Sequence, residues 1–326
     1  MTTTTVRPFR FGFTGGASSK REKLLDSAQT VEALGYSTFG LADHFVRPFA
    51  PLLAGQAVAD ATTTLRITQT VLAQDFREPA VLAKELATLD VLSEGRLQVG
   101  LGAGWLRQEY EDAGMRFDPA PVRIARLEET AIILKGLFSE GPFSFAGEHY
   151  TVNELQGVPR PVQQPRPPIM IGGGGRKVLS VAGRQADIVQ LMPSNPGGKS
   201  LLDASQFSAE AIEEKIGWIR DAGGSRFDEI ELSAQLLECV VTDRPEEHLS
   251  DFAERIAAVT ERMGGARVSF DPEDLRKSPI VAVGSLDEVC EQLVETRARY
   301  GISYFSAPID ARPEALAPVI QRLAGT

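Results

Sequence analysis

Short apolar runs alternate with longer segments of helical periodicity along the whole sequence. A short apolar run followed by apolar positions three and four residues apart is typical of a βα unit. The pattern predicts strands at residues 8–13, 37–42, 65–73, 96–102, 168–175, 186–192, 229–241 and 302–308. It predicts helices at residues 19–34, 51–61, 78–95, 121–138, 177–185, 206–221, 246–263 and 286–300. Repeated alternation of this kind indicates parallel strands with helices packed on them.

Eight predicted strands in 326 residues indicate an α/β fold, a (β/α)₈ TIM barrel that forms a single domain over residues 1–326. A doubly wound open sheet is the alternative, but the turn after the first strand reads FGFTGGASSK and lacks the G-x-G-x-x-G signature. Residues 141–168 break the alternation between the fourth and fifth strands. They read as a hairpin followed by the proline-rich connector GVPRPVQQPRPPI, so we expect an insertion there.

Small residues dominate the predicted strand ends, which is where a barrel of this type carries its functional groups. These ends are Thr14-Gly15-Gly16, Asp43-His44, Thr70-Val71, Gly102-Ala103-Gly104-Trp105 and Gly172-Gly173-Gly174-Gly175-Arg176. Four glycines that lead into a helix favour a phosphate bound by backbone amides, with a charge-assisted bond from Arg176. Gly102 and Gly104 would leave room for a flat ring, with Trp105 lining the pocket. The alternative interpretation of Gly172 to Gly175 is a mobile turn. The alternative for Gly102 to Gly104 is a tight turn over a packed Trp105.

His44 is the candidate catalytic residue. It follows the second strand in FGLADHF, and the neighbouring Asp43 could hold the imidazole in one tautomer for proton transfer. A structural histidine is the alternative interpretation, and we assign His149 and His248 to that class.

Composition narrows the partners to small molecules. The 34 Lys and Arg residues against 44 Asp and Glu give a net charge of −10, which disfavours nucleic acid and anionic membrane surfaces. No apolar run approaches the ~20 residues of a spanning helix, so we expect a cytoplasmic protein. Cys239 and Cys290 are expected to be buried reduced thiols. Because no metal-ligand spacing, P-loop or acyl-transfer motif appears, we expect an organic cofactor.

Five segments resemble the luciferase-like monooxygenase superfamily of flavin- or deazaflavin-dependent (β/α)₈ oxidoreductases. They are VEALGYSTFGLADHF, REPAVLAKELATLDVLSEGRLQVGLGAGWLRQEYEDAG, RIARLEETAIILKGLF, PRPVQQPRPPIMIGGGG and ADIVQL. Within this superfamily the chain is most similar to the branch that uses coenzyme F420. The resemblance implies a hydride transferred between the deazaflavin ring and a small organic substrate.

The resemblance also implies roles for the strand ends. Asp43 and His44 would border the ring, and a non-proline cis bond at Thr70-Val71 would support it. Gly102 to Gly104 would lie beside the ring or its tail, and Gly172 to Gly175 with Arg176 would hold the cofactor phosphate. Members usually form homodimers through helices of the early βα units, and the insertion at 141–168 is expected to cover the barrel mouth.

Two other functions stay open. One is a monooxygenase that receives FMNH₂ from a partner reductase, and the other is a barrel that binds F420 or FMN without turnover. Trp105 stands where sugar-phosphate dehydrogenases of the superfamily have an acid, which argues against sugar-phosphate oxidation. We also expect no charged cluster at the rim beyond the groups that hold the cofactor.

Overall fold

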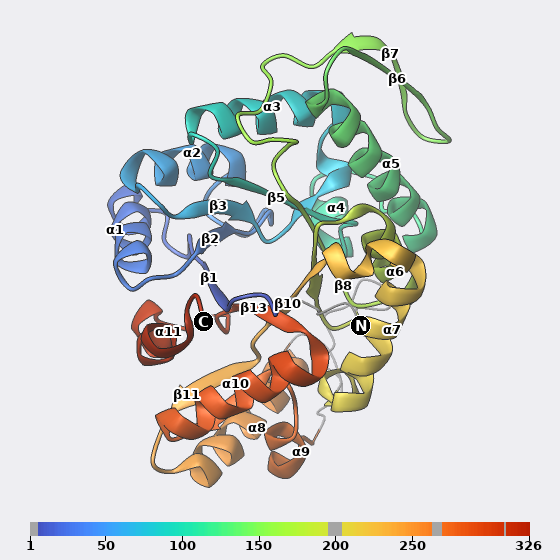
Figure 1. The fold of residues 1–326 in the computed structure, drawn as a ribbon. Coiled ribbons are helices and arrows are strands. Elements are labelled where there is room, and N and C mark those ends of the chain that lie inside the picture. The colour runs from blue at the N-terminus through green and yellow to red at the C-terminus, as the bar shows by residue number, and fades with distance from the viewer. Residues whose placement is uncertain (1–5, 195–203, 263–268, 310) are drawn as a thin grey trace.

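The predicted barrel strands form and close into a ring (Figure 1). The computed structural model describes residues 6–194, 204–262, 269–309 and 311–326. Within these ranges the barrel strands are β1 (Arg10–Thr14), β2 (Thr38–Leu41), β3 (Arg66–Gln69), β4 (Leu72–Ala73), β5 (Leu97–Gly102), β8 (Ile169–Gly173), β9 (Ile188–Leu191), β10 (Glu231–Gln235) and β13 (Ile302–Ser306). They pair in the order β3-β2-β1-β13-β10-β9-β8-β5, and β3 pairs with β5 to close the ring. Because β3 and β4 both pair with β5, they form one stave, and the described chain has the expected eight-stave parallel barrel.

Helices surround the barrel on its outer side (Figure 1). They are α1 (Arg21–Ala33), α2 (Pro51–Ala61), α3 (Pro79–Leu92), α4 (Arg107–Asp112), α5 (Ala120–Phe138), α6 (Arg176–Gln185), α7 (Ala209–Gly223), α8 (Pro245–Arg262), α9 (Pro272–Arg276), α10 (Leu286–Tyr300) and α11 (Ala317–Leu323), with short 3₁₀ turns at Gln74–Phe76, Ala204–Phe207, Gly224–Glu229 and Pro313–Leu316. Local chemistry sets their ends. In α10, Ser285 and Glu288 form a capping box, and Gly301 ends the helix with a φ of 72°.

The main core lies between the barrel and this helical layer. Every residue of β5 is buried, because a parallel strand in a barrel is covered on both faces. The outer side chains of β5 are Leu97, Val99 and Leu101, which belong to the core shared with the helices. Gln98 is fully buried and donates to Thr68 Oγ1 at 3.3 Å. The tight packing of β5 against its neighbours positions the segments that follow at the barrel mouth.

The predicted seventh strand, residues 229–241, is two strands in two different sheets. β10 belongs to the barrel, whereas β11 (Glu238–Val241) pairs in parallel with β12 (Val281–Gly284), a strand that the sequence pattern did not reveal. The change of partner occurs where the Leu236 amide donates to Ser306 and the Leu237 amide donates to Ile280. A separate apolar cluster packs α8 and α9 against this two-stranded sheet. It comprises Leu249, Phe252, Ala253, Ile256, Ala257, Phe270, Leu275, Val281 and Val283.

The insertion forms the expected hairpin but lies on the outside of the barrel. Its strands β6 (Pro142–Ala146) and β7 (Thr151–Gln156) are antiparallel and pack on α5. The Glu129 carboxylate of α5 accepts hydrogen bonds from the amides of residues 148–150. No residue of 141–168 lines the cavity at the barrel mouth. The expectation that the insertion covers the mouth is therefore wrong.

Candidate active site

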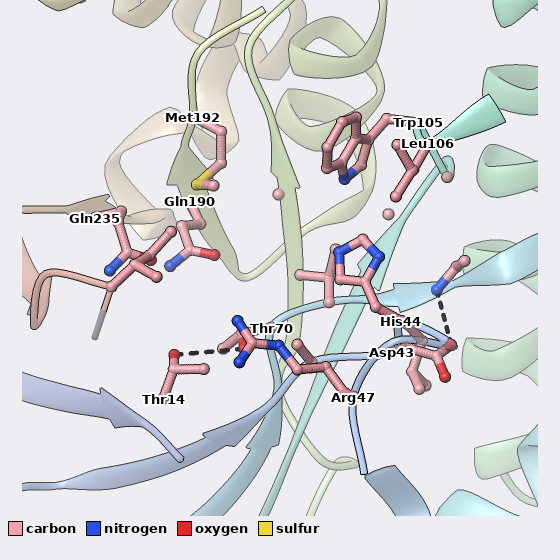
Figure 2. Close-up of a pocket in the computed structure, with 18 of the residues that line it drawn as sticks. Thr14, Asp43, His44, Arg47, Thr70, Trp105, Leu106, Gln190, Met192 and Gln235 are labelled. Carbon is pink, nitrogen blue, oxygen red and sulfur yellow. Dashed lines mark hydrogen bonds between the residues drawn. The ribbon is translucent and has the colours of Figure 1, made fainter. Parts of the chain in front are cut away.

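A cavity of about 820 Å³ opens at the C-terminal ends of the barrel strands. Figure 2 shows that its walls come from strand ends that are distant in the sequence. The predicted site residues that line it are Asp43, His44, Thr70, Val71, Gly102, Gly104, Trp105 and Gly172 to Gly175. Arg176, at the start of α6, is exposed and does not line the cavity. A contact between Arg176 and a cofactor phosphate stays a prediction.

His44 is held by a carboxylate that the sequence analysis did not identify. Glu109 lies on α4 and is 6% exposed, and its Oε2 is 2.7 Å from His44 Nδ1. The other oxygen of Glu109 accepts a hydrogen bond from the Phe45 amide at 2.8 Å. The ring of Trp105 meets the imidazole edge-on, with the ring centroids 5.7 Å apart. The imidazole is thus fixed on two sides at the cavity wall.

This pairing determines what His44 offers to a ligand. An ionised carboxylate only accepts hydrogen bonds, so the imidazole proton is assigned to Nδ1, which donates a hydrogen bond to Glu109. Nε2 is then the nitrogen available for exchange, and the described residues provide no hydrogen-bond partner for it. Figure 2 shows the imidazole turned toward the cavity and Trp105. His44 can therefore give or take a proton at Nε2.

Asp43 has a different role from the tautomer-holding one considered for it. Its carboxylate accepts two hydrogen bonds from Arg77, at 2.6 and 3.0 Å, and a third from the Ala73 amide at 3.1 Å. The acid is thus fully engaged and ties the loop after β2 to the stave that contains β4. Asp43 shapes the cavity wall, whereas Glu109 holds the histidine.

The Thr70–Val71 segment joins β3 to β4, and its peptide bond is cis, as the resemblance implied. A Cβ added to Gly102 would lie 2.4 Å from Val71 Cγ2, and one added to Gly172 would lie 3.2 Å from Val71 Cγ1. The two glycines therefore leave the space that the Val71 side chain fills. On the β1 side, the hydroxyls of Thr14 and Thr70 are 3.5 Å apart. The result is a branched apolar side chain on the cavity wall with small residues around it.

Packing alone explains part of the glycine cluster after β8. A Cβ on Gly174 would lie 2.3 Å from the carbonyl oxygen of Met192, and one on Gly173 would lie 2.5 Å from Val178. Gly175 is more open, since an added Cβ would meet only Ser194 Oγ at 4.0 Å. Gly175 also precedes α6, where backbone amides can face an anion. Binding of a phosphate by this segment stays a prediction.

Arg123 of α5 stabilises the loop after β5. Its guanidinium donates to the carbonyl oxygens of Ala103 and Gly104 and, through Nε, to that of Asp118 at 2.9 Å. Burial lowers the pKa of Arg123, while nearby Tyr110 and Asp75 act in the opposite direction. Burial also raises the pKa of the Tyr110 phenol, which donates to Asp75 at 3.3 Å. These groups are engaged with the protein itself and serve to hold the loop.

One expectation about charge at the rim stays a prediction, and another is wrong. The residue after the glycines of β5 is Trp105, and the nearby carboxylate of Glu109, four residues later, is engaged by His44 and by the Phe45 amide. The argument against sugar-phosphate oxidation, which rests on Trp105 in place of an acid, therefore stays a prediction. The rim also carries the cations Lys23 and Arg47, which line the cavity and were not identified from the sequence.

The part of the chain that the structure describes contains no cluster of His, Cys, Asp and Glu that could hold a metal ion. Cys239 and Cys290 are buried free thiols, and burial raises the pKa of Cys239 to about 12. No described helix has the length and apolar character needed to cross a membrane.

Sequence comparisons give one family and two kinds of enzyme. The family model described as luciferase-like monooxygenase matches residues 1–304. An FMNH₂-dependent dimethylsulfone monooxygenase of Pseudomonas putida is 34% identical over 131 residues, which are 40% of this chain and 36% of that protein. An F420-dependent glucose-6-phosphate dehydrogenase of Kineococcus radiotolerans is 34% identical over 196 residues, 57% of each chain. The chain thus spans less than two thirds of the length of either relative.

Solved structures agree on the fold. An F420-dependent tetrahydromethanopterin reductase from Methanopyrus kandleri has a TM-score of 0.76 at 18% identity, with 97% of this chain and 99% of that chain covered. An F420-dependent secondary alcohol dehydrogenase has a TM-score of 0.73 at 19% identity, with the same coverage. At these identities the likeness concerns the barrel architecture.

Proposed function

Because the chain belongs to the luciferase-like monooxygenase family, we propose that it is a coenzyme F420-dependent oxidoreductase acting on a small organic substrate. The observation that carries this proposal is the His44–Glu109 pair at the cavity wall. Reduction of a C=O, C=N or activated C=C by hydride needs a proton at the neighbouring atom. A histidine with one nitrogen anchored and the other free is suited to supply it.

The residues of the cavity fit a flat tricyclic cofactor. The volume of about 820 Å³ lies within the range of roughly 300–1,000 Å³ typical of cofactor and ligand pockets. Val71, between Gly102 and Gly172, presents an apolar surface on which a ring can rest. Gly175 at the start of α6 would contact the phosphate. Bound reduced deazaflavin would supply the hydride equivalent.

The protein's own contribution is then orientation and proton transfer. Protonated His44 donates from Nε2 to the substrate atom that gains the electron pair, and in the oxidative direction Nε2 accepts that proton. Glu109 stabilises the protonated imidazole through Nδ1 and keeps the ring in place. The side chains of Trp105 and Leu106 line the cavity beside His44 and offer the substrate an apolar surface.

The FMNH₂-dependent monooxygenase remains the second candidate, supported by the Pseudomonas relative. Such an enzyme would need a partner reductase and oxygen. Deazaflavin has carbon in place of the flavin nitrogen-5 and reacts poorly with oxygen, so the two candidates differ in a measurable way.

Titration of the full chain with F420 and, separately, with FMN tests the proposal. We expect saturable quenching of F420 fluorescence and weaker binding of FMN. Oxidation of reduced F420 by an enone such as cyclohexenone, without oxygen consumption, would support the F420 enzyme. Substrate-dependent oxygen uptake with FMNH₂ would favour the monooxygenase. Cofactor binding without any turnover would favour a carrier, and retention of neither cofactor would contradict all three.

We also propose a homodimer formed through the early helices. The helices α2 and α3 carry exposed apolar side chains: Leu53 is 77% exposed, Val81 56% and Leu92 55%. Such side chains favour a protein contact. We expect light scattering to give twice the chain mass of 35.3 kDa, and the double variant Leu53→Glu/Leu92→Glu to be monomeric. Val294→Glu, at an exposed apolar site on α10, is the matched control; a monomeric wild type would contradict the proposal.

A further inference from the structure

The cavity contains two cations that no described carboxylate neutralises. Its acids, Asp43 and Glu109, are already paired with Arg77 and with His44 and the Phe45 amide. The guanidinium of Arg123 is likewise engaged, by backbone carbonyl oxygens. Lys23 and Arg47 also line the cavity, and within the described ranges neither side chain has a hydrogen-bond or ion-pair partner. Among the described residues that line the cavity, positive charge is therefore in excess, although the chain has a net charge of −10.

Arg47 points into the cavity. It lies in the loop after β2, where its backbone amide donates to the His44 carbonyl oxygen at 2.9 Å. This turn keeps Arg47 on the same cavity wall as His44, and Figure 2 shows the Arg47 side chain extending into the cavity. The guanidinium is only partly exposed, and a bound anion would supply a counterion that the described residues do not.

The two cations lie away from the predicted phosphate segment. Lys23 comes from α1, which follows β1, and Arg47 follows β2. The glycine cluster follows β8, and β3 and β5 separate β2 from β8 in the barrel. A cofactor that rests on Val71 with its phosphate near Gly175 leaves the β1–β2 side of the cavity for the substrate.

We propose that Arg47, assisted by Lys23 at the mouth, binds an anionic head group of the substrate, a carboxylate, sulfonate or phosphate. The proposal rests on the proposed function and adds the substrate class. The planar guanidinium can bind two oxygens of such a group at once, which fixes its orientation as well as its position. Held there, the substrate would present its reacting atom to the wall that carries His44 Nε2.

Trp105 gives a direct signal for the test. The chain has two tryptophans, so Trp218→Phe leaves only the one at the cavity. In this background the full chain is titrated without cofactor with benzoate and with benzamide, which match in shape and differ in charge. We expect benzoate to bind about tenfold more tightly, and Arg47→Gln to abolish this preference while benzamide affinity stays unchanged. Arg47→Lys should retain about a third of the preference, because charge remains but the two-point contact is lost.

Three results would overturn the proposal: equal affinity for the two probes, binding of neither, or a preference that survives in Arg47→Gln. The affinity of Arg47→Gln for F420 distinguishes a substrate anion from the cofactor's own phosphate. We expect this affinity to be unchanged, and a tenfold loss of F420 binding would assign Arg47 to the cofactor instead. The probe titration contains no cofactor, so its result is independent of F420 binding. Failure of the substrate-anion proposal can therefore be told apart from failure of the proposed F420 function.

Discussion

His44→Ala is expected to slow the oxidation of reduced F420 by an enone about 10²- to 10⁴-fold, the usual effect of losing a general acid or base. The residue offers Nε2 to the cavity, while Glu109 occupies Nδ1. We expect the affinity for F420 to change little, because Val71 and the glycines around it provide the main surface for the ring. Steady-state rates and fluorescence titration of the same preparation measure the two effects separately.

Glu109→Gln tests the positioning role of the carboxylate. The amide can still accept from the Phe45 amide, but its NH₂ group would face Nδ1 and favour the wrong imidazole tautomer. We expect a rate loss of about 10²-fold with the fold intact. Glu111→Gln, an exposed residue on the same helix, is the matched control and should keep full activity. Equal losses in both variants, or full activity of His44→Ala, would contradict the proton-transfer role.

Gly100→Ala is expected to destabilise the protein by about 3 kcal/mol, the upper part of the range for overpacking a rigid core. A Cβ at this position of β5 would lie 1.8 Å from the carbonyl oxygen of Gln69. The obstacle is backbone, so no side-chain rotation relieves it, and β3 must move away from β5. Gln69 directly precedes Thr70, so cofactor affinity should fall as well. Urea unfolding followed by circular dichroism measures the stability change.

Gly217→Ala on α7 is the control for this substitution. An added Cβ there meets no atom within 4 Å, and alanine is the better helix former by about 1 kcal/mol. We expect unchanged or slightly higher stability. If Gly100→Ala were as stable as this control, the close contact between β5 and β3 would be refuted.

The barrel and most of its rim could be predicted because both depend on local patterns. Apolar runs such as residues 96–102 form strands wherever they are buried on both faces, and helix stops such as Gly95 mark the boundaries. Once the staves are counted, parallel pairing brings all their C-terminal ends to one side. Asp43, Thr70 and Gly172 therefore meet at the cavity although they are far apart in the chain.

Glu109 could not be singled out in the same way. It lies in the short helix RQEYED, whose other acids, Glu111 and Asp112, are exposed. Only the three-dimensional path of the loop after β5 shows which acid turns inward to His44. Arg47 was missed for a similar reason. The direction of its side chain depends on the turn between β2 and α2, and a turn has no hydrophobic periodicity that could be read from the sequence.

The two errors in architecture also have physical causes. The run from Glu229 to Val241 is apolar enough for one long strand, and no residue type marks Leu236 as the point where the chain changes sheets. The insertion was expected at the mouth by resemblance. Its position on α5 depends on contacts of Glu129 with three successive amides and of Gly136 with Phe143, and tertiary contacts of this kind leave no pattern in the sequence.

The chain as a whole is negative, whereas the described cavity wall is positive. The rate at which an anion arrives and the time for which it stays bound should therefore respond differently to charge. At a distance, the net charge of −10 repels anions, and highly charged ones most strongly. Within about one Debye length, roughly 8 Å at physiological ionic strength, the field of Arg47, which has no ion-pair partner among the described residues, dominates instead. Added salt should then speed the arrival of an anionic substrate while shortening its stay. The cavity can therefore retain an anion that the chain as a whole repels at long range.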